Sequence, residues 1–442
     1  MVSHFKFLAF VLAPILANAA AISVAPAKAV QSRSELVASS NVIELTKKTS
    51  VKGYNPRSAA FLKHKVKPST STGTSTLVSL FEGEEFATNI TFGSQTFEVI
   101  VDTGSSDTWV VETGFACVDI ETEAPLTEAD CYFGPTFTPK NFSQIANENF
   151  NITYGDGEFL SGVLGYEQVT LAGITVTQEV AVVNYAAWEG DEETSGLVGL
   201  AYPALTSAYS GSDPHNDTVQ DVYNGIITTM IKDGAIEAPL FSLAILRDVS
   251  GPSGYLALGG LPPVDFVQEF ATTPILVTTI DGYPQTYDFY TIEVDGMTLN
   301  GNTLNGAATP KYIVDSGTTL NYLPTSISDA INKAFIPPAV YEDDEGAYIV
   351  DCKAKAPTFG ITIGGTTFYT NPLDMILLAG TDDDGNDVCI SGIDDGGNDD
   401  VKDVFILGDT FQKNVVVVFD VGAAELHFAA REFYPSNDAY KQ

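Results

Sequence analysis

Two aspartates stand in nearly the same sequence setting, one in each half of the chain. Asp102 ends the apolar run of Val99–Ser106, which reads Val-Ile-Val-Asp-Thr-Gly-Ser-Ser. Asp315 ends the apolar run of Tyr312–Thr319, which reads Tyr-Ile-Val-Asp-Ser-Gly-Thr-Thr. A single Asp of this kind is usually a turn or cap residue. Two copies in one chain indicate instead a pair of carboxylates that work together.

The residues that follow each aspartate are suited to holding its carboxylate in place. Glycine permits a tight turn, and hydroxyl groups can hydrogen-bond a carboxylate and fix its plane. The residues with these properties are Thr103, Gly104 and Ser105 after the first Asp, and Ser316, Gly317 and Thr318 after the second. We therefore expect all six to support the two carboxylates.

A second pair of segments repeats in the same order. Gly196–Leu200 reads Gly-Leu-Val-Gly-Leu, and Phe405–Asp409 reads Phe-Ile-Leu-Gly-Asp. The second glycine of the first segment lies 97 residues after Asp102, and the glycine of the second lies 93 residues after Asp315. Two signals at nearly the same separation predict two lobes of similar topology. A two-fold relation would bring both aspartates to the interface between the lobes, where active sites usually lie.

Two adjacent carboxylates can hydrolyse a peptide bond. They do not both ionise easily, so they share one proton. The charged member can deprotonate a water while the protonated member donates to the peptide carbonyl, in acid and with no metal or cofactor. A glycosidase also uses two carboxylates, but these have no reason to be two-fold related. A Ser/His or Cys/His mechanism is not favoured, because His215 and His427 lie in no catalytic motif.

The elements that would position these residues are short β-strands. The apolar segments are rich in Val, Ile, Thr, Phe and Tyr, and the 442 residues include 38 Gly and 22 Pro. Breakers cluster near 245–262, so we expect an N-terminal β lobe at 74–255 and a C-terminal β lobe at 256–442. No segment after the first 20 residues runs to 18 apolar residues, so no membrane span is expected.

Charge is distributed unevenly along the chain. Residues 21–68 carry a net charge of +7, since nine Lys or Arg stand against two Glu. Residues 69–442 carry −44, with 11 basic and 55 acidic residues, and the whole chain carries −36. So acidic a body repels nucleic acid and anionic membranes. It also suits solubility in acid, where many carboxylates are protonated.

The N-terminus is typical of an exported precursor. Residues 1–20 hold a charged start, the apolar run Phe7–Leu16 and the small residues Ala17–Ala19, which is the order of a signal peptide. The alternative, a buried helix, is a poor fit for a chain end. We expect 21–73 to be a basic pro-segment, joined to the body by the exposed Ser/Thr-rich run 69–76.

Sequons and cysteines fit a secreted, extracellular protein. The N-glycosylation sequons begin at Asn89, Asn141, Asn151 and Asn216. The four cysteines, Cys117, Cys131, Cys352 and Cys389, suggest two disulfides with three possible pairings. A zinc site is the rival interpretation, but no Cys-x-x-Cys spacing exists. The acidic, Gly-rich segment Thr381–Asp403 could suggest a calcium loop, yet it lacks the spaced ligands and is better interpreted as a solvated loop.

These segments resemble the pepsin-like aspartic proteases, and among them the fungal secreted members. The resemblance covers essentially the whole chain after the leader. It rests on four motifs: Val101–Val110, Tyr154–Gly157, Val314–Thr319 and Ile406–Phe411. It implies an all-β, bilobal fold with the active-site cleft between two pseudo-two-fold-related lobes. It also implies a monomeric endopeptidase, made as a zymogen, that acts on proteins and peptides at bulky apolar residues.

The resemblance implies roles for particular residues. Asp102 and Asp315 would be catalytic, with Ser105 and Thr318 bonded to their outer oxygens. Tyr154, Gly155 and Asp156 would belong to a flap over the substrate, with Trp109 bonded to the flap tyrosine. The sequence also indicates a hairpin tip here, between Asn149–Thr153 and Val163–Val169. The disulfides would be Cys117–Cys131 and Cys352–Cys389.

The pro-segment would act as an intramolecular inhibitor. In similar zymogens a basic pro-segment crosses the cleft, and Lys63, Lys65 and Lys67 are candidates for the blocking residue. Acid would protonate carboxylates of the body and weaken the attraction. A pro-segment that only aids solubility is the alternative.

Three features depart from the family pattern. Glu158 stands where a small Ser or Thr is common, which puts the subsites near the flap in doubt. Ser195 stands where Asp is common, and the two aspartates are 213 residues apart, so we expect insertions near 117–131 and 207–218. A catalytically inactive relative that only binds proteins is a further alternative, but both Asp motifs are intact.

Overall fold

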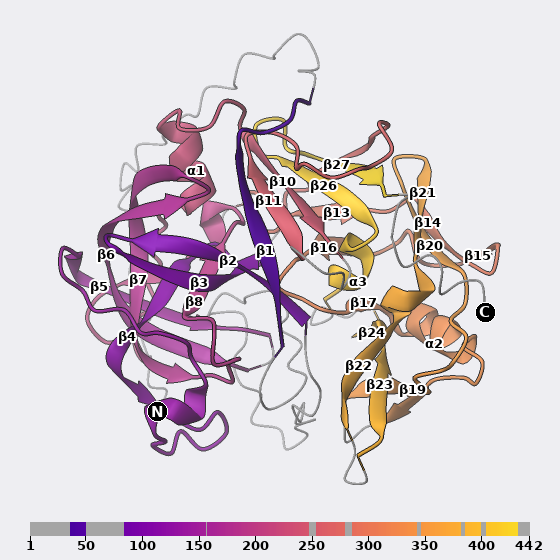
Figure 1. Cartoon of the computed structure of the whole chain (residues 1–442), viewed down its shortest axis with the longest axis horizontal. Helices are drawn as coiled ribbons and strands as arrows, with labels where there is room; N and C mark the ends of the chain where they lie inside the picture. Colours follow the sequence, from indigo (N-terminus) through magenta and orange to yellow (C-terminus); the bar gives the residue numbers. More distant parts are fainter. Residues whose placement is uncertain are drawn as a thin grey trace, which may run out of the picture. The chain divides into compact units, whose positions relative to one another are not determined.

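Strands dominate the structure, as the sequence predicts (Figure 1). The computed structural model describes residues 36–49, 84–155, 157–246, 253–278, 285–342, 346–381, 385–398 and 404–431. The expected signal peptide, most of the expected pro-segment with Lys63, Lys65 and Lys67, and Asp156 lie outside the described residues. Val37–Gln442 forms one compact unit, separate from Met1–Leu36.

Within the described residues, the largest sheet runs through both halves of the chain. Its strands, in spatial order, are β12 (Ala271–Pro274), β27 (Glu425–Ala430), β26 (Val415–Asp420), β10 (Leu240–Ile245), β11 (Gly254–Leu258), β1 (Asn41–Thr49), β2 (Glu84–Phe92), β3 (Gln95–Asp102), β8 (Gly196–Gly199), β4 (Thr108–Cys117), β7 (Ile174–Ala187), β6 (Phe159–Leu171), β5 (Ser143–Thr153) and β9 (Ala208–Ser210).

Three smaller sheets belong to the second half of the described chain. One contains β13 (Thr291–Glu293), β16 (Lys311–Val314), β25 (Ile406–Leu407), β17 (Asn321–Pro324) and β24 (Ile393–Gly397). The second contains β15 (Asn302–Leu304), β14 (Gly296–Leu299), β20 (Phe359–Ile363) and β21 (Thr366–Thr370). The third contains β18 (Val340–Glu342), β19 (Ala347–Val350), β23 (Asp387–Ser391) and β22 (Ile376–Thr381).

Helices are short in the part of the chain that the structure describes. They are α1 (Ile226–Lys232), α2 (Thr325–Lys333), α3 (Asp409–Gln412) and the 3-10 turns η1 (Glu128–Cys131), η2 (Pro203–Leu205) and η3 (Pro372–Met375). No described helix is both long and apolar enough to cross a membrane. The positions of the site residues are therefore set mainly by strand pairing.

The internal repeat corresponds to a repeated strand arrangement. β3 pairs in parallel with β8, which places Asp102 opposite Gly199, and β8 pairs antiparallel with β4. In the second half β16 pairs in parallel with β25, and β25 pairs antiparallel with β17. The two halves thus use the same three-strand pattern, which confirms the prediction of two related topologies.

Strand β1 lies within the segment predicted to be the pro-segment. It pairs antiparallel with β11 through Asn41–Leu45 and with β2 through Thr46–Thr49. Figure 1 shows it in indigo beside β11. The described part of this segment is therefore a strand within the largest sheet.

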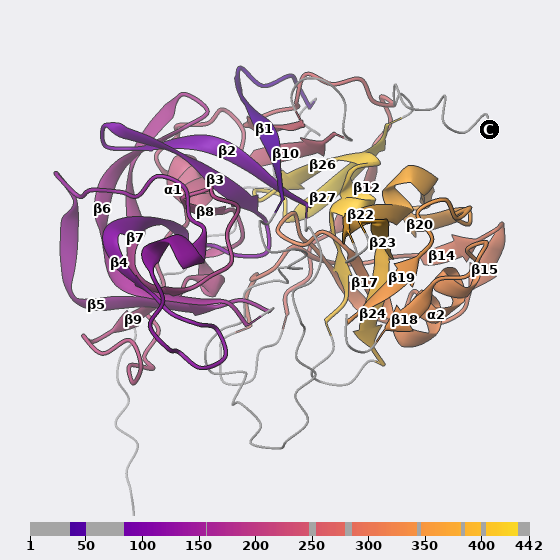
Figure 2. The ribbon, with the colours of Figure 1, turned by 60° about the horizontal axis from the view of Figure 1, so that its bottom comes forward.

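The candidate site is built on densely packed apolar side chains. Figure 2 shows β4, β5, β6 and β7 side by side in the first half of the chain. Trp109 of β4 and Phe150 of β5 pack in one buried cluster with Tyr154, which directly follows β5, and Trp188, which directly follows β7. Close packing of this kind leaves the aromatic rings little freedom to move, so these side chains are held in fixed positions.

Candidate active site

Asp102 and Asp315 occupy equivalent positions in the two halves. Asp102 is the last residue of β3, and its carbonyl accepts a hydrogen bond of 2.8 Å from the backbone N–H of Leu200. Asp315 directly follows β16, and its N–H donates to the carbonyl of Leu407 at 3.2 Å. The two side chains are 4% and 1% exposed. The backbone of each aspartate is therefore held by the second repeated motif of its own half, Gly196–Leu200 for Asp102 and Phe405–Asp409 for Asp315.

Each carboxylate is held by its own loop. The N–H of Gly104 donates to Oδ1 of Asp102 at 2.6 Å, and the Ser105 hydroxyl donates to Oδ2. In the second half the N–H of Gly317 donates to Oδ1 of Asp315 at 2.8 Å, and the hydroxyl of Thr318 donates to Oδ2 at 2.7 Å. These are the contacts expected for the two glycines, Ser105 and Thr318.

Thr103 and Ser316 do something different from what the sequence suggested. We expected both hydroxyls to bond to the carboxylates, but they bridge the two halves instead. The Thr103 hydroxyl donates to the carbonyl of Val314 at 3.0 Å and accepts from the N–H of Ser316 at 2.9 Å. The Ser316 hydroxyl donates to the carbonyl of Val101 at 2.9 Å and accepts from the N–H of Thr103 at 3.2 Å. This reciprocal set ties the two loops together.

The two carboxyl groups lie close together because each loop approaches the other half's aspartate. A Cβ atom added to Gly104 would lie 2.4 Å from Oδ2 of Asp315. A Cβ atom added to Gly317 would lie 2.5 Å from Oδ1 of Asp102. Only glycine leaves room for this approach. Burial, and next to it the charge of Asp102, raises the pKa of Asp315 well above its usual value, so the pair retains a proton in acid.

Tyr154 is joined to Trp109 as the resemblance implied. The indole Nε1 of Trp109 donates to the Tyr154 hydroxyl at 2.9 Å, and Tyr154 is 3% exposed. The expected hairpin is present, although its second strand, β6, begins at Phe159 and not at Val163. Gly155 is half-buried at its turn.

Sequence reasoning missed Trp188 in this region. Its ring lies edge-to-face against Trp109, with ring centres 5.1 Å apart, and against Tyr154 at 5.8 Å. It also stacks on Phe133 at 5.6 Å. Trp188 belongs to no motif, but it is one of only two tryptophans in the chain, which was a signal that could have been used.

Two buried carboxyls near the dyad were also missed. Asp107 accepts hydrogen bonds from the Tyr223 hydroxyl at 2.6 Å and from the N–H of Ser207 at 3.0 Å, and burial raises its pKa to about 6. Asp409, in the second repeated motif, is fully buried, and its N–H donates to the carbonyl of Thr318 at 2.8 Å. Burial, and then the charge of Asp315, raises the pKa of Asp409 well above its usual value.

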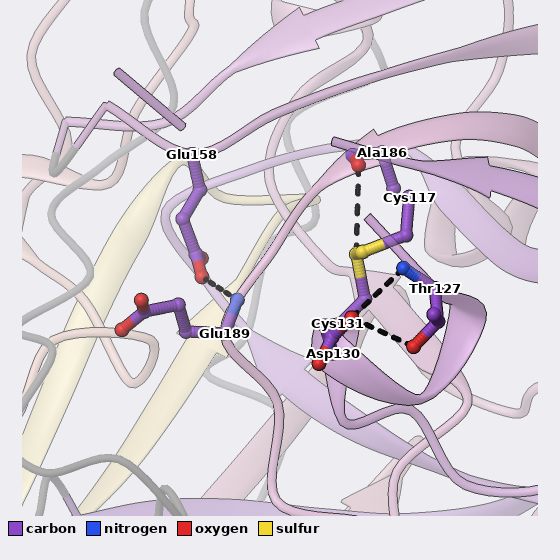
Figure 3. The surroundings of a disulfide bond; sticks show 7 residues. All are labelled: Cys117, Thr127, Asp130, Cys131, Glu158, Ala186 and Glu189. Atoms are coloured by element: carbon purple, nitrogen blue, oxygen red, sulfur yellow. Dashed lines mark hydrogen bonds between the residues drawn. A yellow bond between two sulfur atoms is a disulfide. The ribbon is translucent and has the colours of Figure 1, made fainter. Parts of the chain in front are cut away.

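The cysteines pair as the resemblance implied, Cys117 with Cys131 and Cys352 with Cys389. The first disulfide joins β4 to η1, and Figure 3 shows its surroundings. Among the described residues no group of three or more His, Cys, Asp and Glu side chains is arranged to hold a metal ion.

The comparison with known proteins now decides the family. The sequence model of the eukaryotic aspartyl proteases matches residues 85–431. The chain belongs to the eukaryotic aspartyl protease family. This aspartyl protease is 52% identical, over 88% of its length, to a probable aspartic-type endopeptidase of Aspergillus fumigatus, of which 87% is covered.

More distant relatives and a solved structure agree with this assignment. The aspartyl protease is 25% identical to rhizopuspepsin of Rhizopus chinensis over 84% of the chain and 86% of that protein. Its fold is similar to that of an aspartic proteinase from Irpex lacteus, with a TM-score of 0.62 and 20% identity, covering 89% of this chain and 99% of that one. These findings confirm the predicted bilobal, all-β, pepsin-like fold and the predicted aspartic-type endopeptidase class.

Proposed function

We propose that this aspartyl protease is a secreted acid endopeptidase whose catalytic residues are Asp102 and Asp315. The observation that carries the proposal is the pair of buried carboxyls, each held by a glycine N–H and a hydroxyl and each approached by the other half's loop. Because Asp315 favours its protonated form, one proton remains on the pair in acid.

A water held between the carboxyls would attack the peptide carbonyl carbon. The ionised carboxylate takes a proton from this water, and the protonated carboxyl donates its proton to the carbonyl oxygen. The product is a tetrahedral diol, and the pair has exchanged which member holds the proton. In the second step the ionised carboxylate takes a proton from one hydroxyl of the diol, and the protonated carboxyl donates its proton to the nitrogen of the leaving amine. The C–N bond then breaks, which releases the amine and a carboxylic acid.

The flap and the substrate preference are part of this proposal. Tyr154, Gly155 and Asp156 would face the substrate, with Trp109 holding the tyrosine hydroxyl. A preference for bulky apolar residues at the scissile bond, which the resemblance implies, belongs to the same proposal.

We also propose that the enzyme is made as a zymogen with a signal peptide at 1–20, a pro-segment at 21–73 and lobes at 74–255 and 256–442. Lys48 of β1 supports this, because it is 8% exposed and pairs with Glu98 at 2.9 Å and with Glu193. Burial lowers the pKa of Lys48, but its contacts with these two glutamates outweigh burial and raise it. These ion pairs hold a basic residue of β1 against the acidic body, as expected of a basic pro-segment.

Export and glycosylation complete the proposal. Asn89, Asn141 and Asn216 are exposed. The side-chain amide of Asn216 donates to Asp213 at 2.8 Å and that of Asn151 to the carbonyl of Pro214 at 2.8 Å, so Asn89 and Asn141 are the better acceptors. The extracellular environment would also keep the two disulfides oxidised.

Casein cleavage at about pH 3.5, near which a carboxyl pair keeps one proton, tests the dyad. After removal of the pro-segment, the wild-type enzyme should cleave casein in a pepstatin-sensitive way. Asp102→Asn and Asp315→Asn should each lower kcat by at least about 100-fold, since each removes one acid–base group. Asp233→Asn, an exposed position at the end of α1, is the matched control and should leave the rate unchanged. Full activity in either dyad variant would disprove the assignment.

A further inference from the structure

Glu158 is a buried carboxyl beside the flap that the mechanism above does not use. Its side chain is 0% exposed, just before β6 begins at Phe159. Burying a carboxylate is unfavourable unless a hydrogen bond compensates for the lost water. A glutamate at this position therefore needs a partner, and the partner shows what the side chain does.

The side chain of Glu158 reaches a neighbouring segment while its backbone holds the flap. The backbone N–H of Glu189 donates to Oε1 of Glu158 at 2.7 Å, as Figure 3 shows. The backbone carbonyl of Glu158 accepts a hydrogen bond of 2.8 Å from the N–H of Tyr154. One residue thus contacts both the flap tyrosine and the segment that follows β7.

That segment carries Trp188 immediately before Glu189. The Trp188 ring contacts the rings of Trp109 and Tyr154, and Trp109 donates to the Tyr154 hydroxyl. The contacts therefore close a circle from Tyr154 through Glu158 and the 188–189 backbone to the Trp188 ring, and back to Tyr154. A change at Glu158 would release Trp188 and remove one wall of the site in which the tyrosine ring lies.

We propose that Glu158 is a positioning residue that keeps Tyr154 in place by holding the Trp188–Glu189 backbone. The proposal rests on the proposed function, in which Tyr154 faces the substrate. The hydrogen bond needs an acceptor oxygen and not a negative charge, so glutamine at this position retains the effect and alanine loses it.

The test uses the mature enzyme with Glu158→Ala and Glu158→Gln. Trp109 and Trp188 are the only tryptophans of the chain and their rings are in contact, so indole fluorescence and the indole bands of the near-ultraviolet circular dichroism report on this cluster. The matched control is Glu167→Ala, because Glu167 is also a buried glutamate, near the end of β6, and its Oε1 also accepts a backbone N–H, that of Gln168 at 2.9 Å.

We expect Glu158→Ala to lower kcat/KM for a peptide substrate by roughly 10- to 100-fold, as small misplacements in active sites do. Its indole dichroism should fall by about half while far-ultraviolet dichroism and the unfolding transition remain those of a folded protein. Glu158→Gln should lie within about threefold of the wild type in both readouts, since it keeps the acceptor. Glu167→Ala should change neither.

Unchanged indole dichroism and kcat/KM in a folded Glu158→Ala variant would overturn the proposal, and so would a loss in Glu158→Gln as large as that in Glu158→Ala. If the wild-type protein cleaves no peptide, the proposed function fails. The dichroism and fluorescence of the same variants then still decide whether Glu158 holds Trp188.

Discussion

Two glycines from opposite halves of the chain lie against the carboxyls of the two aspartates. Gly104 contacts the carboxyl of Asp315, and Gly317 contacts that of Asp102. These positions have no room for a side chain, because a Cβ atom at either glycine would overlap a carboxyl oxygen of the opposite aspartate. A methyl group is thus enough to separate the carboxyls without removing either one.

Gly317→Ala should therefore inactivate the enzyme while both aspartates remain. We expect kcat to fall by at least about 100-fold, because the dyad geometry is lost. Gly296→Ala is the matched control, since a Cβ atom at Gly296 has no other atom within 4 Å. Rates measured on casein in acid, with thermal unfolding to verify the fold, check the prediction. A Gly317→Ala enzyme as active as the control would contradict it.

The contacts of some site residues could be predicted from the sequence, and those of others could not. The repeated Asp-hydroxyl-Gly motif was sufficient to predict the hydroxyl contacts of Ser105 and Thr318, because these are local to one loop. The glycines were expected to permit the turns, and their N–H groups also donate to the carboxylates. The roles of Thr103 and Ser316 could not be predicted, because their partners lie on strands of the other half. Trp188 was missed for the same reason, since a ring contact across strands leaves no spacing in the sequence.

At the level of strands, some pairings could likewise be predicted from the sequence and others could not. The parallel pairs β3–β8 and β16–β25 follow from the two repeated motifs, so the sequence was enough to predict two equivalent units. The sheet that joins β1, β10, β11 and β26 does not follow from them, because β1 and β26 are distant in sequence from β10 and β11. Short strands with little periodicity do not specify their partners.

The second disulfide is an element-level support outside the dyad. Cys352 and Cys389 are 37 residues apart, and a loop of this length is expected to contribute between about 3 and 4.7 kcal/mol to stability by restricting the unfolded chain. Cys352→Ala with Cys389→Ala should lower the free energy of unfolding by this amount and leave kcat nearly unchanged. Denaturant unfolding of both proteins under oxidising conditions checks this. Equal stabilities would refute it.

At the scale of the whole molecule, the net charge of −36 is accompanied by buried carboxyls that resist ionisation. Burial, and to a smaller extent the charge of Asp395, raises the pKa of Asp394 from 3.8 to about 7. The folded protein therefore keeps this proton where the unfolded chain has lost it. The stability associated with Asp394 is complete below about pH 4 and decreases as pH rises to about 7.

Asp394→Asn should flatten the pH dependence of stability. The difference in the free energy of unfolding between the variant and the wild type should grow by up to about 4 kcal/mol, in favour of the variant, as pH rises from about 3 to about 7. The reason is that the variant lacks the ionisation that opposes folding. Unfolding free energies from urea titrations across this range provide the measurement. The exposed Asp233→Asn should follow the wild-type curve, and an Asp394→Asn curve parallel to the wild type would show that Asp394 does not contribute.

The order of strands in the largest sheet also constrains how the chain can be made. β10 pairs with β26, so Leu240 is joined to Asp420, and β16, next to Asp315, pairs with β25. Translation delivers β10 and β16 long before their partners, and unpaired strand edges are prone to aggregation. These strand edges stay unpaired until β25 and β26 have been synthesised, and pairing across so long a sequence separation slows folding.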